Sequence, residues 1–72
     1  MSGRPVKHSL TLRGHRTSVS LEDEFWQAFR EIAKKYEKPI NVLAAEIDAE
    51  RGADIGLASA IRVFVLNHYR TK

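Results

Sequence analysis

The chain contains no cysteine and only two prolines among its 72 residues. Without cysteine the fold cannot be held by disulfide bonds, and this absence is typical of proteins in a reducing compartment. No apolar run reaches the length of a signal peptide or a membrane-spanning helix, so we expect a cytoplasmic protein that does not enter a membrane. A monomeric core is marginal at this size, which makes oligomerisation the expected source of further stability.

Acidic residues are also absent from the first 20 positions, which hold four basic ones: Arg4, Lys7, Arg13 and Arg16. Residues 21–72 have a net charge of −1, so the basic excess of the protein lies entirely at its N-terminal end. A basic segment of this kind suits a polyanion, although a solvated tail without a partner is the alternative. We assign residues 1–15 to a basic, partly extended N-terminal arm and residues 16–72 to the folded domain.

A short strand is predicted over residues 16–21, because two classes of side chain alternate there with a period of two. The face expected to be buried has Thr17, Val19 and Leu21, and the outer face has Arg16, Ser18 and Ser20. Residues 7–12 alternate loosely and could form an additional strand, ended by a hairpin turn or a bulge at Gly14 and His15. A strand this short is not stable alone, so it needs a pairing partner.

Helices are predicted for most of the remaining chain, so the fold class is mostly α with one short N-terminal strand. The first helix should run from residue 21 or 22 to residue 37, with Ser20 as its N-cap. A shorter helix should cover residues 41–50. The last, over residues 57–69, is apolar nearly all round, and one chain cannot cover it on most sides. A second copy of the chain could, which places this helix in a dimer core.

Residues with metal-binding or catalytic chemistry form no recognisable site, so we predict no cofactor and no metal. His8, His15 and His68 lack ligand spacing and are expected to be solvated or hydrogen-bonded. The acids Glu46, Asp48 and Glu50 have no histidine or cysteine partner and are assigned to a solvated face. Arg62, on the last helix, should pair with an acid such as Glu31 or Asp54. No Ser–His–acid arrangement is evident, which argues against an enzyme.

The order of these elements resembles that of ribbon-helix-helix DNA-binding domains of the Arc and MetJ type. The matching motifs are Ser18-Val19-Ser20-Leu21 before the first helix and Gly-Leu-Ala-Ser-Ala-Ile-Arg over residues 56–62. The resemblance covers about residues 16–69. Within the family, this sequence is similar to a bacterial subfamily, with an extra helix between the usual two helices. It implies an intertwined homodimer, in which one strand from each chain pairs into a two-stranded antiparallel ribbon that enters the major groove.

The resemblance also implies roles for individual residues. The outward strand residues would contact bases: Arg16, Ser18 and Ser20. Phosphates would be contacted from the basic arm and from the N-terminus of the last helix: Lys7, Arg13, Gly56, Leu57, Ala58 and Ser59. The dimer core would contain Val19, Leu21, Phe25, Phe29, Ile61, Phe64 and Val65. Two serines specify bases poorly, so much of the specificity should rest on Arg16 and on DNA shape.

The function favoured by the sequence is that of a homodimeric, sequence-specific regulator of transcription that binds double-stranded DNA, such as a repressor. Its dimers could assemble further on adjacent half-sites. The alternative is a protein-interaction module, for example an antitoxin-like dimer, in which the helix around residues 40–51 binds a partner.

Overall fold

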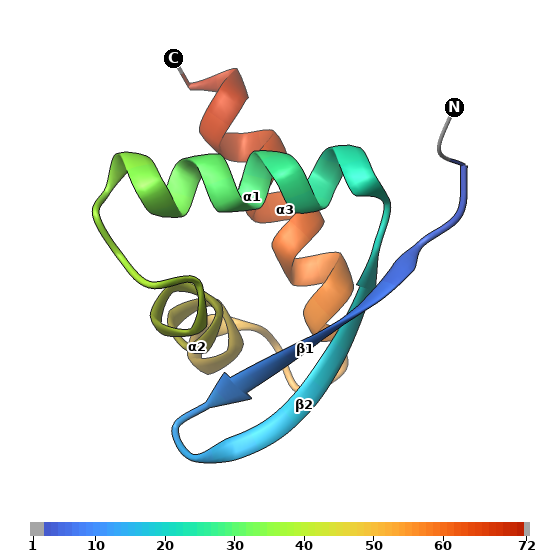
Figure 1. Cartoon of the computed structure of the whole chain (residues 1–72), viewed down its shortest axis with the longest axis vertical. Coiled ribbons are helices and arrows are strands. Elements are labelled where there is room, and N and C mark those ends of the chain that lie inside the picture. The colour runs from blue at the N-terminus through green and yellow to red at the C-terminus, as the bar shows by residue number, and fades with distance from the viewer. Residues whose placement is uncertain (1–2, 72) are drawn as a thin grey trace.

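The computed structural model describes residues 3–71. The elements are β1 (Val6–Leu12), β2 (His15–Leu21), α1 (Asp23–Lys35), α2 (Ile40–Glu50) and α3 (Leu57–Arg70). The strands form an antiparallel hairpin, and the helices pack against one face of it. In Figure 1, α1 crosses the top of the molecule, α3 passes behind it, and α2 is seen nearly end-on. The predicted two-stranded antiparallel ribbon and the mostly helical fold are confirmed.

Both strands of the ribbon come from one chain, because a tight turn at Arg13 and Gly14 folds β1 back onto β2. The φ angles of these two residues are 53° and 86°. Positive φ at both central positions is what a two-residue type I′ hairpin turn requires. The resemblance implied one strand from each of two chains, whereas here residues 6–12 of the same chain supply the second strand. Residues 6–12 of the basic arm therefore form one of the two strands of the ribbon.

The inner face of the hairpin is largely apolar and forms one side of the core. Leu10 and Leu12 of β1 and Val19 and Leu21 of β2 are all buried against the helices. Thr17 lies on the same face, opposite Leu10, but it is exposed. The prediction that Thr17 would be buried is therefore wrong for the single chain, because the helices do not cover the turn end of β2.

Helix α1 begins later than predicted. Ser20 remains in β2, and the N-cap is Glu22, whose side chain makes no capping hydrogen bond. The predicted Ser20 cap is wrong because the strand continues through Leu21 before the helix starts. The helix ends at Lys35, two residues before the predicted end, where Glu37 adopts a φ of 55°. The amide N–H of Lys38 donates to Ala33 and that of Glu37 to Lys34, the two bonds of a Schellman motif.

The core is centred on Phe29 and Ile32 of α1, Ile61 of α3 and Leu21 of β2, which are fully buried. His8 of β1 stacks on Trp26 of α1 with the ring centroids 3.9 Å apart and the planes 7° from parallel. Its Nε2 atom is buried without a hydrogen-bond partner among the described residues. The prediction that His8 is solvated or hydrogen-bonded is therefore wrong for its Nε2 atom, because the ring stacks on Trp26.

Helices α2 and α3 lie within one residue of their predicted bounds. Helix α3 buries Ile61 and Val65 toward α1 and the hairpin, but Val63 and Leu66 are 55% and 52% exposed. One chain thus covers only one side of this apolar helix. Within residues 3–71, no helix has the length and apolar character needed to cross a membrane.

Candidate nucleic-acid interface

The outer face of the hairpin carries cations and hydroxyl groups and no acid. The antiparallel register places three pairs of side chains on this face: Lys7 with Ser20, Ser9 with Ser18, and Thr11 with Arg16. All six residues are exposed. The period of two that buries leucine and valine on the inner face therefore gathers these side chains on one polar surface. We call it the outer ribbon face.

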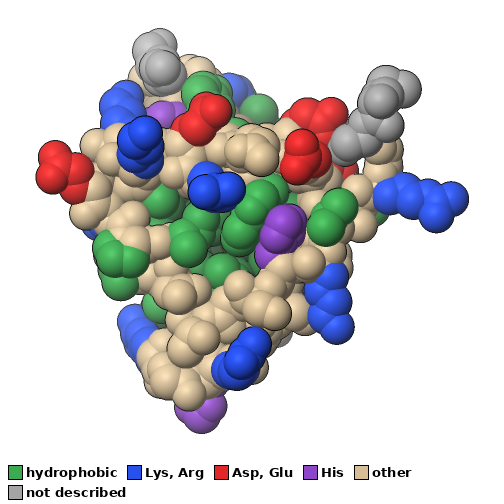
Figure 2. Space-filling view, viewed as in Figure 1, with side chains coloured by type: hydrophobic (Ala, Val, Ile, Leu, Met, Phe, Trp, Pro, Cys, Tyr) green, Lys and Arg blue, Asp and Glu red, His purple; other side chains and the backbone are tan. Residues whose placement is uncertain are grey.

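The charges of the molecule are unevenly distributed in space. Figure 2 shows the acidic side chains of this view over the upper part of the molecule, around α1, while the lower part over the hairpin carries Lys, Arg and His. Hydrophobic side chains are visible in the centre, between α1 and the hairpin. A polyanion that approaches the hairpin end meets positive charge without an opposing acidic patch on this side.

The three predicted base-contacting residues lie together on the β2 half of the outer ribbon face. Arg16, Ser18 and Ser20 are spaced two residues apart and are exposed. Because Ser20 does not cap α1, its side chain stays on this face. Sequence reasoning missed Ser9 and Thr11 of β1, which lie opposite Ser18 and Arg16. The loose alternation over residues 7–12 was the signal that could have found them.

This combination of side chains matches the chemistry of a major groove. An arginine can donate two hydrogen bonds to guanine O6 and N7, and a serine or threonine hydroxyl can donate to or accept from any base. A lysine at the margin can neutralise a phosphate. The major groove is about 12 Å wide and admits a two-stranded ribbon.

The predicted phosphate contacts lie at two places around the hairpin. Lys7 is on the outer ribbon face, and Arg13 is at the exposed turn. The N-cap of α3 is Gly56, without a side-chain hydrogen bond, so the amides of Leu57, Ala58 and Ser59 have no capping partner from that residue. Arg13 lies near the start of α3, because Arg13 and Leu57 line one hollow of about 330 Å³ at the turn end of the hairpin, whereas Lys7 is at the other end of β1.

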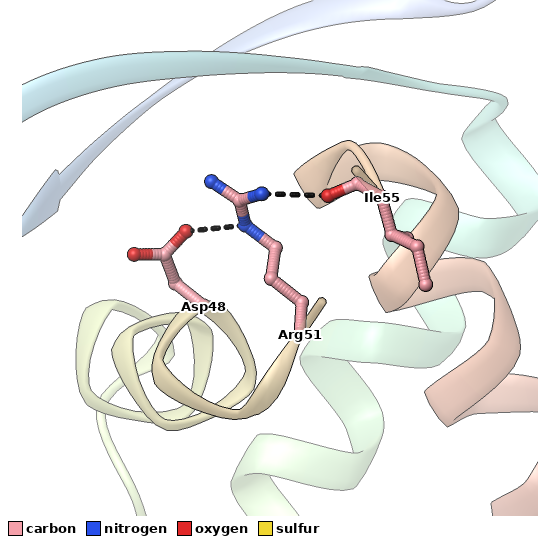
Figure 3. A network of polar contacts seen from close by, with 3 residues as sticks. All are labelled: Asp48, Arg51 and Ile55. Atoms are coloured by element: carbon pink, nitrogen blue, oxygen red, sulfur yellow. Dashed lines mark hydrogen bonds and ion pairs between the residues drawn. The ribbon is translucent and has the colours of Figure 1, made fainter. Parts of the chain in front are cut away.

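Arg51 fixes the loop that leads into α3. Its Nε donates to the Asp48 carboxylate at 2.7 Å, and its Nη1 donates to the carbonyl of Ile55 at 2.6 Å (Figure 3). The end of α2 is thereby linked to the residue before the Gly56 cap. Asp48 is paired and partly buried, and Glu46 is paired with Lys38 at 2.7 Å. The two carboxylates remain 44% and 38% exposed, so they lie on a solvated face, as predicted, and form ion pairs there.

Arg62 of α3 joins the end of β2 to the start of α1. Its guanidinium is 2.8 Å from the Glu22 carboxylate and 3.5 Å from the carbonyl of Ser20. The predicted pairing with an acid is confirmed, but the partner is Glu22 in place of Glu31 or Asp54. A hydrogen bond from its own backbone N–H, together with the Arg62 guanidinium, holds the pKa of Glu22 below its ordinary value of 4.5.

The two edges of the hairpin differ. In a two-residue hairpin Leu12 and His15 form the first hydrogen-bonded pair, so the backbone groups of alternate residues point away from the ladder. On β1 these include Thr11, whose N–H donates to Asn41 Oδ1 of α2 at 3.0 Å. On β2 they are Arg16, Ser18 and Ser20. Only the Ser20 carbonyl has a partner within the described residues, the Arg62 guanidinium. Within residues 3–71 the β2 edge is therefore open at Arg16 and Ser18, and the β1 edge is open at Lys7 and Ser9.

The residues predicted for a dimer core are located in the core of one chain. Five are buried within the protomer: Val19, Leu21, Phe29, Ile61 and Val65. Phe25 and Phe64 are partly buried and pack against them. Contacts within one chain thus cover most of this set, and its role in dimerisation stays a prediction.

Groups of three or more His, Asp or Glu that could hold a metal ion are not found in the described part of the chain. Of the other two histidines, His15 is exposed at the start of β2. His68 packs edge-on against Tyr36 and Tyr69, with ring centroids 5.9 and 5.0 Å apart.

Comparison with known proteins finds one family model that matches this chain. The model of the ribbon-helix-helix domain family matches residues 5–69, which include both strands, α1, α2 and nearly all of α3. No curated protein and no solved structure matches the chain. The match includes α2, so its description as an addition to the family stays a prediction.

Proposed function

Because the chain belongs to the ribbon-helix-helix family, we propose that it is a sequence-specific DNA-binding regulator of transcription. Proteins of this family generally bind DNA and regulate transcription. The proposal adds that this chain binds double-stranded DNA with the outer ribbon face in the major groove. Arg16 would be the main base-reading residue, with Ser18 and Ser20 beside it. Regulation by repression in the cytoplasm fits this activity.

The observation that supports the proposal best is the composition of the outer ribbon face. Two cations and four hydroxyls occupy all six outward positions of paired strands, and none of these positions is acidic or apolar. A surface without a polyanionic partner has no need to exclude acids in this way. Phosphate contacts by Lys7, Arg13 and the first amides of α3 would provide most of the affinity, and Arg16 would provide specificity.

The proposed active form is a homodimer. Val63 and Leu66, three residues apart on α3, are more than half exposed, and Tyr69 continues their stripe with 44% exposure. A chain of 72 residues buries a small core, and covering this stripe would remove further apolar surface from water. Two copies would also present two sets of reading residues to the two halves of an inverted repeat.

Selection from sheared genomic DNA at about 150 mM salt tests the proposal. The wild type should enrich a short inverted repeat. Arg16→Ala should lose this enrichment and keep weak, salt-sensitive binding, because a bidentate arginine–guanine contact contributes about 1–3 kcal/mol of discrimination. Arg30→Ala is the matched control, since Arg30 is exposed on α1 away from the ribbon. If the wild type retains no DNA, the proposed function is wrong.

A protein-binding module is the second candidate, and one hollow favours it. The end of α1, α2 and α3 enclose about 360 Å³, with Leu43 and Phe64 among the apolar lining and the Lys38–Glu46 pair at the border. An apolar side chain of a protein partner would fit a hollow of this size. If selection returns no DNA, affinity capture with wild type and Asn67→Arg compared side by side becomes the deciding experiment, because Asn67 lines the hollow and is exposed.

A further inference from the structure

The inner face of the hairpin is uncovered at its turn end, and a hollow of about 330 Å³ lies there. Three basic side chains from three segments line it: Arg13 of the turn, His15 of β2 and Arg51 at the end of α2. His15 and the exposed Thr17 alternate with Arg16 along β2, so the hollow belongs to the side of the hairpin opposite the outer ribbon face. DNA bound to the outer ribbon face would therefore leave this hollow unfilled.

Arg51 is held in place and still has donors to spare. Its Nε donates to the Asp48 carboxylate at 2.7 Å, and its Nη1 donates to the Ile55 carbonyl at 2.6 Å. A guanidinium has five N–H donors in a rigid fork, so three remain after these two bonds. In Figure 3 the third nitrogen points away from both partners, toward the hairpin. Because the side chain is already fixed, binding an anion costs it little further rotamer entropy.

Arg13 contributes the excess positive charge of the hollow. Asp48 is paired with Arg51, so among the described lining residues Arg13 has no acidic counterpart. Arg13 has a φ of 53° at the first central position of the turn, where asparagine, aspartate and glycine are favoured. An arginine is strained in this conformation, and strained residues cluster at ligand-binding and other functional sites. The turn thus keeps a cation beside the hollow although its geometry favours other residues.

We propose that the hollow binds a small organic phosphate through the guanidinium groups of Arg13 and Arg51. Arginine forks match the oxygens of a phosphate and donate paired, charge-assisted hydrogen bonds to it. Leu57, the first residue of α3, also lines the hollow, so the positive end of this helix favours an anion there. The volume lies at the small end of the range of ligand sites, and Leu12 and Ala45 provide apolar surface for the organic part.

The proposed ligand would regulate DNA binding through Arg13. In the proposed function Arg13 contacts a DNA phosphate, and one side chain cannot bind two phosphates at full strength at once. Ligand and DNA therefore weaken each other's binding, by the same factor in both directions. This regulatory step rests on the proposed function, whereas the ligand site itself does not.

A nuclear magnetic resonance titration of the full chain without DNA tests the site. The probe is ribose 5-phosphate at constant ionic strength, and ribose is the uncharged control. We expect saturable shifts of the amide signals around the hollow, over residues 12–17 and 51–59, with the phosphate only. Arg13→Asn should raise the dissociation constant about tenfold or more, because it removes charged donors and suits the positive φ of the turn. Arg30→Asn removes the same charge from an exposed position of α1 and should leave the constant unchanged.

Shifts that do not saturate, or equal dissociation constants for Arg13→Asn and wild type, would overturn the ligand site. Signals at the hollow that respond to DNA but not to ribose 5-phosphate would also overturn it, because the phosphate bound there would then belong to the DNA backbone.

The regulatory step is read separately, by fluorescence anisotropy with the selected DNA. Saturating ribose 5-phosphate should raise the dissociation constant of the DNA about fivefold or more for wild type, and not for Arg13→Asn. An unchanged constant for wild type would contradict the regulation. A protein that binds ribose 5-phosphate at the hollow but binds no DNA would support the ligand site and remove the proposed function.

Discussion

The two faces of one hairpin have opposite chemistry although their residues alternate along the same two strands. The inner face buries leucine and valine against three helices, and the outer face exposes two cations and four hydroxyls. Residues only one position apart therefore serve different purposes. The comparison teaches that burial explains the leucines and Val19 of the inner face, whereas stability within one chain offers no reason for the composition of the outer face.

The largest expected effect is on stability, and it is found by comparing substitutions at two neighbouring residues, one on each face of the hairpin. Val19→Asp would place an unpaired charge at a position that is 4% exposed, which should lower the free energy of unfolding by about 4 kcal/mol or more. Ser18→Asp introduces the same group on the exposed face and should change it by less than about 0.5 kcal/mol. Urea unfolding followed by circular dichroism measures both. Equal destabilisation would show that the outer face is also packed.

The next largest expected effect is on the affinity for DNA, and it uses the same outer position, Ser18. Ser18→Asp should weaken DNA binding by more than about tenfold, because the added carboxylate faces phosphates and acceptor atoms of the bases. Gln27→Asp changes the net charge equally on an exposed position of α1 and is the control. Fluorescence anisotropy with the selected DNA gives the affinities. A similar loss in both variants would mean that only the net charge matters.

A smaller change sharpens the role of the β1 strand. If Lys7 contacts one phosphate, Lys7→Ala should reduce the slope of log binding constant against log salt by about 0.9 for each bound copy of the chain. Lys35→Ala, at the end of α1 on an exposed position, should leave the slope unchanged. Titrations at four salt concentrations measure it. A constant slope for Lys7→Ala would remove β1 from the interface.

The smallest effect concerns the end of β2, where Arg62 and Glu22 meet. The pKa of Glu22 is lowered in the folded protein, so the ionised carboxylate stabilises the fold at pH values above its ordinary value of 4.5. This contribution is lost as the pH falls below 4.5 and through the lowered pKa. Wild type should therefore exceed Glu22→Gln in stability at pH 7, and the difference should shrink toward pH 3. A difference that is independent of pH would exclude an ionic contribution.

Periodicity in the sequence predicted the helices and the strand over residues 16–21 well. The apolar spacing of α1 and α3 and the alternation of residues 16–21 depend on neighbours along the chain, which a sequence displays directly. Arg16, Ser18 and Ser20 were accordingly placed on one exposed face. The sequence also predicted that Arg62 pairs with an acid, although not which one, because a partly buried guanidinium on an apolar helix needs a carboxylate.

The remaining features depend on contacts between distant residues. Whether Ser20 ends the strand or caps the helix was decided by the pairing of Leu21 with Val6, fifteen residues earlier. The source of the second ribbon strand was decided by the turn at Arg13, a residue type that rarely adopts positive φ. The stacking of His8 on Trp26 likewise joins two elements whose packing the sequence does not display.

The hydrogen bond from Thr11 to Asn41 has a consequence for how far self-association can proceed. A sheet with two open edges can add strands without end and grow into a fibre. With Asn41 of α2 bound to the Thr11 N–H, the β1 edge is interrupted near the turn, and within residues 3–71 its outward groups stay unpaired at Lys7 and Ser9. An added strand could therefore pair with β1 only away from the turn, and Asn41 is the side chain that shortens this edge.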